Sequence, residues 1–185
     1  TKRKMPVVTQ GGKTGLVAAG VPVEGNEVVL QMARMNKIET GDEYGTGIVK
    51  CQAGCVLQDM QEHCADERNL LFPVDLGAKG TCQIGGNLAS NAGGQFYYRY
   101  GRLAANVVGL RVVLMDGSVL DLNFTKCNLK DNTGYKLHQL MIGSEGTLGV
   151  ITDVAIGCPV LPKSRMAAML ACSSFNEVLA TVRHA

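Results

Sequence analysis

Glycine is concentrated in a few stretches of this chain. The chain holds 23 glycines in 185 residues, which is roughly 12% against about 7% in average proteins. They gather at 11–25, 77–94, 101–117 and 143–149. Hydrophobic residues make up 46% of the chain, which is enough to build a core. Clustered glycine beside ample apolar content indicates loops that follow tight paths, not a disordered chain.

The segment Pro73–Gly94 contains six of these glycines and no aromatic residue. Glycine lets a flat ligand lie against bare backbone, and short polar side chains can bond to a heterocycle or a ribityl chain. The polar residues that suit this role are Thr81, Asn87, Ser90 and Asn91. A permissive surface loop is the alternative, but it does not need Ile84 and Leu88 at buried-looking positions. We therefore predict a long irregular loop over 72–94 with a binding function.

A second glycine cluster, Gly11-Gly12-Lys13-Thr14-Gly15, follows a short β-prone run at 6–9. A P-loop would need glycine at position 7, where the chain has Val7, so NTP hydrolysis is not predicted. The Rossmann pattern is absent after any strand. Exposed backbone N–H groups and the Thr14 hydroxyl still make a concavity that suits a diphosphate. The alternative is a purely structural turn.

A third glycine-punctuated region runs through Asp131–Tyr135 and then Leu140–Thr152. Its turn leads into a β-prone strand. We expect this turn to bring Glu145 and the backbone of residues 146–151 close to the ligand of the segment Pro73–Gly94.

The apolar periodicity predicts an α+β fold. Helices are expected at 55–68 and 175–184, and strands at 6–9, 27–32, 47–52, 107–115, 118–122 and 150–156. Asp116-Gly117 predicts a two-residue type I′ turn, which makes the strands at 107–115 and 118–122 an antiparallel hairpin. No regular βαβ alternation is visible, so a doubly wound sheet is not expected.

Charge and cysteine usage exclude several classes of protein. A net charge of +2 gives no electrostatic case for a nucleic acid or an anionic membrane. No apolar run approaches the roughly 20 residues that cross a bilayer. The seven cysteines are odd in number and form no CxxC pair, which favours a reduced compartment. The spacing of Cys51, Cys55, His63 and Cys64 does not converge on a zinc ion.

Together the motifs resemble the FAD domain of the vanillyl-alcohol oxidase/p-cresol methylhydroxylase superfamily. The runs Pro73–Asn87 and Lys130–Tyr135 are more similar to its D-2-hydroxyglutarate dehydrogenase group than to its D-lactate dehydrogenase group. The likeness covers about Lys4 to Pro162. It implies a PCMH-type fold of two α+β subdomains with the first incomplete, an FAD-binding domain at 1–162 and the start of a substrate domain at 163–185. Both ends of the chain are expected to continue in the whole family domain.

The resemblance also implies which residues hold FAD. Facing the diphosphate would be Gly11, Gly12, Thr14 and Gly15. Lining the diphosphate, ribityl chain and isoalloxazine would be Pro73, Gly80, Thr81, Gly85, Gly86, Asn87, Ser90 and Asn91. Bordering the adenosine would be Glu145, Gly146 and Ile151. Some relatives attach flavin through a histidine in the first loop; here Lys13 stands there, so the FAD is expected to be non-covalent. Lys13 also replaces the asparagine that is usual in the group.

The implied activity is hydride transfer from C2 of a D-2-hydroxyacid to flavin N5, in a mitochondrial enzyme that passes electrons to an acceptor such as an electron-transfer flavoprotein. The catalytic base and a divalent metal are expected beyond residue 185, and no metal site is expected in this chain. His63 and His138 are expected on a helix surface or in a loop. A D-lactate dehydrogenase-like flavoenzyme and a catalytically silent flavin-binding fragment stay open as alternatives.

Overall fold

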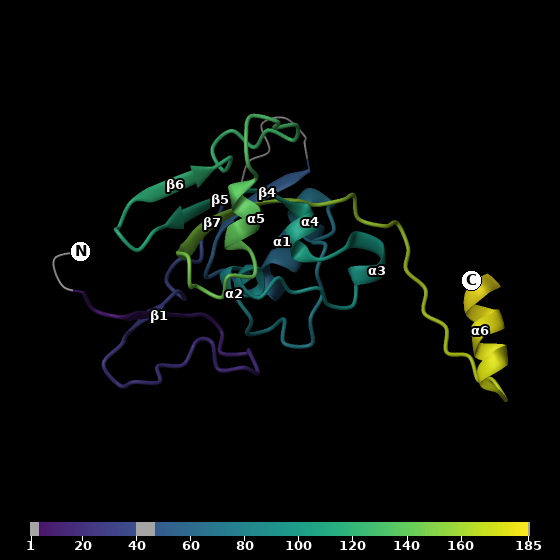
Figure 1. Ribbon diagram of the computed structural model, residues 1–185. Helices are drawn as coiled ribbons and strands as arrows, with labels where there is room; N and C mark the ends of the chain where they lie inside the picture. Colours follow the sequence, from purple (N-terminus) through teal and green to yellow (C-terminus); the bar gives the residue numbers. More distant parts are fainter. Residues whose placement is uncertain (1–3, 40–46, 185) are drawn as a thin grey trace.

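A five-stranded antiparallel sheet organises the protein (Figure 1). The structure is a computed structural model, of which we describe residues 4–39 and 47–184. The strand order is β3-β4-β7-β5-β6, and each neighbouring pair is antiparallel. The strands are β3 (Ile38–Glu39), β4 (Ile48–Gln52), β7 (Val150–Gly157), β5 (Val107–Val113) and β6 (Val119–Leu122). The predicted strands at 47–52 and 150–156 are confirmed, and so is the α+β class.

The centre of this sheet is the core of the molecule. β-branched residues fill β5 and β7, and such side chains pack well on a pleated, buried surface. Leu110, Val112 and Val154 are fully buried. They form one apolar cluster with residues from the helices that cover the sheet, including Leu57, Met60, Ile84 and Leu88.

Helix α1 (Leu57–Arg68) confirms the predicted amphipathic helix. Its buried residues Leu57, Met60 and Cys64 recur at helical spacing and join the core. The helix ends at Asn69, which adopts the left-handed conformation that commonly closes a helix. The start of α1 is tied to the loop ahead of the next helix, because Leu57 N donates to Cys82 O (3.0 Å).

Helix α2 (Ile84–Ala89) lies inside the segment predicted to be irregular, so that prediction is wrong over these six residues. The two glycines in Ile84-Gly85-Gly86-Asn87-Leu88-Ala89 disfavour a helix by local propensity. Tertiary packing overrides this preference, because Ile84 and Leu88 are fully buried and α2 contacts β7. Three further short helices are α3 (Tyr97–Tyr100), α4 (Leu103–Asn106) and α5 (Leu137–Met141).

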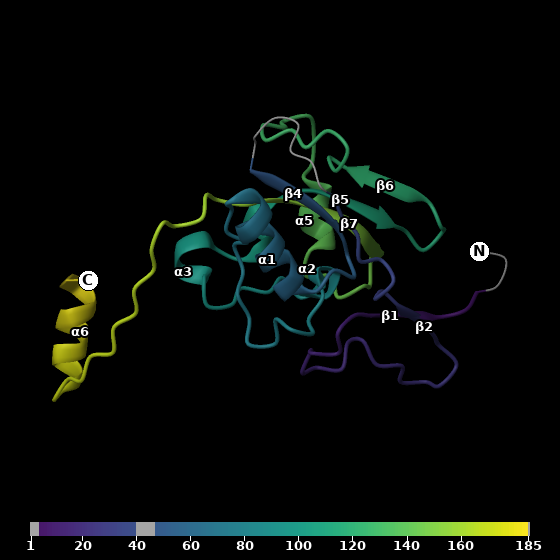
Figure 2. The same ribbon diagram turned by 180° about the vertical axis from the view of Figure 1, so that it is seen from behind.

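A separate two-stranded parallel sheet contains β1 (Val7–Gln10) and β2 (Val28–Gln31), which confirms the strands predicted at 6–9 and 27–32. It lies beside the main body, and the loop after β1 runs along the body's edge (Figures 1 and 2). Val28, Val29 and Leu30 are each about two-fifths exposed, at 41%, 40% and 41%. This pair of strands therefore buries far less apolar surface than the main sheet.

The hairpin of β5 and β6 is antiparallel as predicted, but its turn is not type I′. A type I′ turn needs φ > 0 at both central residues, and here Gly117 has φ 88 whereas Asp116 does not have positive φ. Gly117 N donates to Leu114 O and Leu114 N donates to Ser118 O, both at 2.9 Å. The loop therefore has three residues, and a glycine in the left-handed region closes it.

Beyond β7 the chain leaves the body. Residues 163–172 have no helix or strand, and the predicted helix at 175–184 is confirmed as α6 (Phe175–His184). Both views show α6 standing apart from the sheet and the other helices (Figures 1 and 2). Phe175, Val178, Leu179 and Val182 form an exposed apolar stripe on it. No helix among the described residues is both long and apolar enough to cross a membrane.

Candidate functional site

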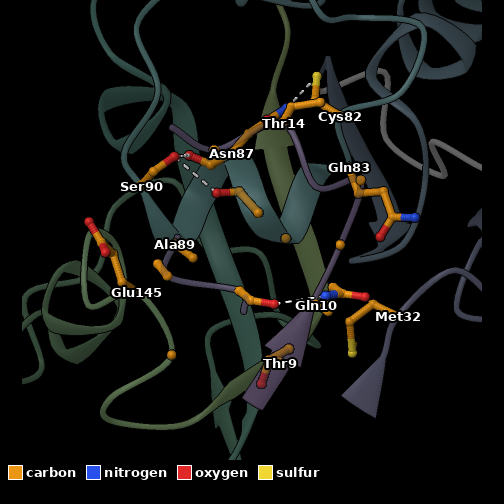
Figure 3. Close-up of a pocket in the computed structure, with 18 of the residues that line it drawn as sticks. Thr9, Gln10, Thr14, Met32, Cys82, Gln83, Asn87, Ala89, Ser90 and Glu145 are labelled. Carbon is orange, nitrogen blue, oxygen red and sulfur yellow. Dashed lines mark hydrogen bonds between the residues drawn. The ribbon is translucent and has the colours of Figure 1, made fainter. Parts of the chain in front are cut away.

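A cavity of about 500 Å³ lies between the loop after β1 and the α2 region of the body (Figure 3). Its volume is in the range of small-molecule and cofactor sites, roughly 300–1,000 Å³. We call the first side, residues 9–21, the N-terminal wall. We call the second side, made by residues 82–92 with 144–151, the body wall. Figure 3 shows Ser90 and Glu145 at one side of the cavity and Gln83 at the opposite side.

The N-terminal wall presents backbone donors. Within the part of the chain that the structure describes, the N–H groups of residues 11–15 donate to no protein acceptor. Lys13 has φ 59 in the middle of this run. A left-handed residue among successive free amides is typical of an anion-binding nest. The loop predicted to suit a diphosphate therefore has the backbone form that such a ligand needs.

The two walls meet at Gly12. A Cβ on Gly12 would lie 1.9 Å from the carbonyl oxygen of Thr81, so only glycine fits this approach. Gly11 is next to it, and a Cβ there would lie 3.2 Å from Gln83 Oε1. Gly11 and Gly12 thus allow a close approach between the loop and the body, in addition to any role in the conformation of the loop.

The body wall is fixed by hydrogen bonds to the turn that follows β4. Gly85 N donates to Ala53 O (2.7 Å), and Ile84 N donates to Cys55 O (2.9 Å). A Cβ on Gly85 would meet Ala53 Cβ at 2.7 Å, whereas a Cβ on Gly86 would meet nothing within 4 Å. Gly85 therefore lets α2 pack against the turn after β4, and Gly86 leaves open space on the cavity side.

The third predicted region closes the body wall. Gly143 N donates to Leu88 O (2.9 Å), and Glu145 N donates to Ala89 O (3.0 Å). These bonds hold residues 143–146 against the end of α2 before the chain enters β7. Glu145 therefore lies beside the segment Pro73–Gly94. Its approach to a ligand of that segment stays a prediction.

The cavity carries little fixed charge and one unmet hydrogen-bond acceptor. Lys13 and Glu145 are the only charged residues in its lining, among the residues that the structure describes. Gln83 is buried, and its Oε1 has no hydrogen-bond partner among the residues that the structure describes. Burial raises the pKa of the Cys82 thiol, which keeps it neutral. A ligand with donors for Gln83 and an anionic group for the free amides would satisfy both ends of the site.

Most of the predicted binding residues line this cavity. They are Gly11, Gly12, Thr14, Gly15, Gly85, Gly86, Asn87, Ser90, Glu145, Gly146 and Ile151. Pro73, Gly80, Thr81 and Asn91 do not line it. The carbonyl group of Thr81 lies against Gly12, and Pro73 is buried. Asn91 lines a neighbouring cavity, and its Oδ1 accepts from Ala104 N (3.3 Å).

Sequence reasoning did not name several residues of the cavity. Among them are Thr9, Gln10, Val17, Met32, Ala53, Cys82 and Gln83. Met32 and Ala53 come from beyond the glycine clusters, and only the tertiary fold brings them here. One pattern could have identified Gln83 as a candidate: it is a polar residue between Cys82 and Ile84, two apolar residues that are both buried.

The histidines lie outside this cavity. His63 is 7% exposed, so its predicted place on a helix surface is wrong; its Nδ1 lies 3.2 Å from Glu67 Oε2. His138 belongs to α5 and lines the neighbouring cavity, which has a volume of about 1,310 Å³. Burial lowers the pKa of His138. Across residues 4–39 and 47–184, no three His, Cys, Asp or Glu side chains are arranged to hold a metal ion.

Comparison with known proteins agrees with this geometry. Residues 1–123 match the family described as the FAD binding domain. This chain belongs to the FAD-binding-domain family. Among solved structures, alkyldihydroxyacetonephosphate synthase is similar over 88% of this chain and 29% of that chain, with a TM-score of 0.76 and 25% identity.

Curated relatives of this FAD-binding domain are longer proteins. The chain is 52% identical to the mitochondrial D-2-hydroxyglutarate dehydrogenase of Rattus norvegicus over 98% of its length, and to that of Danio rerio over 97%. It is 44% identical to the D-2-hydroxyglutarate–pyruvate transhydrogenase of Saccharomyces cerevisiae over 95%. It covers 33%, 33% and 34% of these relatives, so it spans about a third of their length.

The residues of the cavity fit FAD, the ligand of this family. A diphosphate needs donors, and residues 11–15 offer unpaired N–H groups. A flavin ring needs a smooth apolar face with a few polar contacts. Gly86, which faces open space, supplies the smooth surface, and the unpartnered Gln83 Oε1 supplies an acceptor.

Proposed function

We propose that this chain forms the FAD-binding part of a mitochondrial FAD-dependent D-2-hydroxyglutarate dehydrogenase. The proposal rests mainly on one observation: the backbone N–H groups of residues 11–15 are free, and Gly86 of α2 leaves open space in the same cavity. That cavity occurs in a chain about half identical to relatives named D-2-hydroxyglutarate dehydrogenase, at 52% for two of them.

Each part of the cavity has a proposed role toward FAD. The diphosphate lies at Gly11, Gly12, Thr14 and Gly15, with the Thr81 carbonyl group against Gly12. Gly80, which does not line the cavity, is given no contact with FAD. The ribityl chain and isoalloxazine lie along Gly85, Gly86, Asn87 and Ser90. Pro73 and Asn91, which do not line the cavity, are given no contact with the flavin. The adenosine lies beside Glu145, Gly146 and Ile151. The FAD is held without a covalent bond, because Lys13 stands where some relatives carry a histidine. When bound, FAD supplies the acceptor for hydride from C2 of the hydroxyacid.

In this proposal the residues of this chain bind and orient FAD, and they do not select the hydroxyacid substrate. Glu145 is the only carboxylate that lines the cavity in the described part of the chain, and its backbone N–H is bonded to Ala89 O. The buried Cys82 thiol is neutral, since burial raises its pKa. We assign the base, the divalent metal and the residues that recognise substrate to parts of the enzyme outside these 185 residues. Residues 1–162 would then be the FAD domain and 163–185 the beginning of the substrate domain. Electrons would pass to an acceptor such as an electron-transfer flavoprotein.

The test is a visible spectrum of the purified chain with FAD, before and after anaerobic addition of a hydroxyacid. The proposal predicts an oxidised-flavin spectrum that is perturbed by the protein and not bleached by D-2-hydroxyglutarate. In the enzyme that contains this domain, D-2-hydroxyglutarate bleaches the flavin faster than D-lactate does. Bleaching by the isolated chain contradicts the assignment of the catalytic groups to other residues. Faster bleaching of the enzyme by D-lactate favours the lactate alternative.

A silent flavin-binding fragment is the second candidate. The position of α6 favours it, because its apolar stripe at Phe175, Val178, Leu179 and Val182 has no cover among the described residues. Mixing the FAD-loaded chain with the rest of the enzyme separates the two. Restored turnover supports the enzyme part, whereas binding without turnover supports the silent fragment.

A further inference from the structure

Lys13 is the one cationic residue among the described residues that line the cavity. It stands in the middle of the free amides of residues 11–15 and has no ion-pair partner in the described part of the chain. Its φ of 59 is a conformation that residues other than glycine, asparagine, aspartate and histidine seldom adopt. A lysine kept in this conformation calls for a reason beyond loop geometry.

The charge balance of the cavity supplies that reason. Glu145 contributes one negative charge, and a diphosphate brings about two more. Free amides stabilise such an anion through partial charges, but they do not neutralise it. The Lys13 ammonium is the only full positive charge that the lining offers.

We propose that Lys13 is a specificity-determining residue that pairs with the diphosphate of FAD and favours ligands carrying it. This inference rests on the proposed FAD site. It predicts that removal of the lysine charge weakens FAD but spares riboflavin, which has the same ring and no phosphate.

The lysine has two separable effects. Its charge strengthens binding of an anion, whereas its side chain makes the left-handed backbone less favourable. Lys13→Gln removes the charge and keeps an ordinary L-residue at this φ. Lys13→Asn removes the charge and also suits the left-handed region. Lys13→Arg keeps the charge. Lys163→Gln, in the exposed segment after β7, removes the same charge away from the cavity.

The experiment measures the affinity of the full chain for FAD and for riboflavin by quenching of flavin fluorescence, at low and high ionic strength. We expect Lys13→Gln to weaken FAD binding about tenfold at low ionic strength, in the range of a charge-assisted contact, and to flatten its salt dependence. Riboflavin affinity stays unchanged. Lys13→Arg restores FAD binding, and Lys163→Gln matches the parent chain. FAD binding by Lys13→Asn loses its salt dependence, as it does in Lys13→Gln, but Lys13→Asn unfolds at a higher temperature than Lys13→Gln.

The outcomes separate this inference from the function on which it rests. If the parent chain binds no FAD, the proposed function fails. If it binds FAD and Lys13→Gln binds FAD equally well with the same salt dependence, the role of Lys13 is overturned. Equal loss of FAD and riboflavin in Lys13→Gln also overturns it, since that result assigns Lys13 to loop structure instead of charge.

Discussion

The two walls of the cavity are built in different ways. Ile84 and Leu88 of the body wall are fully buried and tied to the central sheet. The N-terminal wall rests on β1 and β2, where Val28 and Val29 stay about two-fifths exposed. Buried apolar area is the main source of stability, so the body wall is formed before any ligand binds. The N-terminal wall depends more on its contacts with the body and on the ligand.

Only a few atoms join the N-terminal wall to the body. Gly12 approaches the Thr81 carbonyl, and Gly11 lies beside Gln83. A ligand that fills the cavity contacts both walls, so its binding free energy stabilises the weaker wall. Flavin binding and order of the N-terminal wall should therefore rise together.

The largest contrast should appear in stability. Leu88→Ala removes a fully buried side chain and is expected to lower the free energy of unfolding by about 2–5 kcal/mol. Val29→Ala, in the half-exposed β2, should lower it by less than about 1 kcal/mol. Urea unfolding followed by circular dichroism measures both. Equal losses for the two variants contradict the contrast between the walls.

The second-largest effect is expected at Gly12, where the N-terminal wall contacts the body. Gly12→Ala puts a Cβ 1.9 Å from the Thr81 carbonyl, which forces the N-terminal wall away from the body. We expect FAD affinity to fall by about a hundredfold, equivalent to about 2.7 kcal/mol. Gly134→Ala is the matched control, because its Cβ meets nothing within 4 Å and the residue lies outside the cavity. Fluorescence titration with FAD measures both, and similar losses for the two would remove Gly12 from this role.

Two neighbouring glycines on α2 should separate folding from binding. Gly85→Ala forces its Cβ against Ala53 and is expected to cost about 1–3 kcal/mol of stability. Gly86→Ala has space and should raise the free energy of unfolding by about 0.5–1 kcal/mol, since alanine favours helix. Its methyl group occupies the cavity face, so FAD binding should weaken. A Gly86→Ala chain that binds FAD as well as the parent moves the ligand off this face.

The smallest effect should be one of pH. Hydrogen bonds from the backbone N–H groups of Glu24 and Val23 lower the pKa of Glu27 to about 2, from an ordinary value of 4.5. The stabilisation is therefore fully present above pH 4.5 and is lost as the pH falls toward 2. Hydrogen exchange at residues 23–28 should accelerate across this window, ahead of the core. Glu27→Gln should abolish that pH dependence, and a retained dependence would assign it to another group.

Local patterns predicted much of the fold. Helical spacing of Leu57, Met60 and Cys64 marked α1, and β-branched runs marked β5 and β7. The prediction failed at α2, because two glycines oppose a helix locally and only burial of Ile84 and Leu88 stabilises it. It also failed at the β5–β6 turn, where the same Asp-Gly pair allows a three-residue loop.

The candidate site was predictable where backbone chemistry leaves a trace in the sequence. The glycines at 11–15 and 85–86 were identified because close approach and open space both require glycine. Met32 and Ala53 were missed, since nothing local marks a residue that lines a cavity only through strand packing. Thr81 and Asn91 were included for their polar side chains, but Thr81 contributes its carbonyl to the wall contact and Asn91 faces the neighbouring cavity.

Amide hydrogen exchange of the full chain with and without FAD is the most direct test of the central claim. FAD is expected to protect the N–H groups of residues 11–15, which have no acceptor in the described part of the protein, and to change exchange in residues 82–92 far less. Protection confined to residues 133–139, which line the neighbouring cavity, would contradict it, and so would FAD binding that leaves residues 11–15 unprotected.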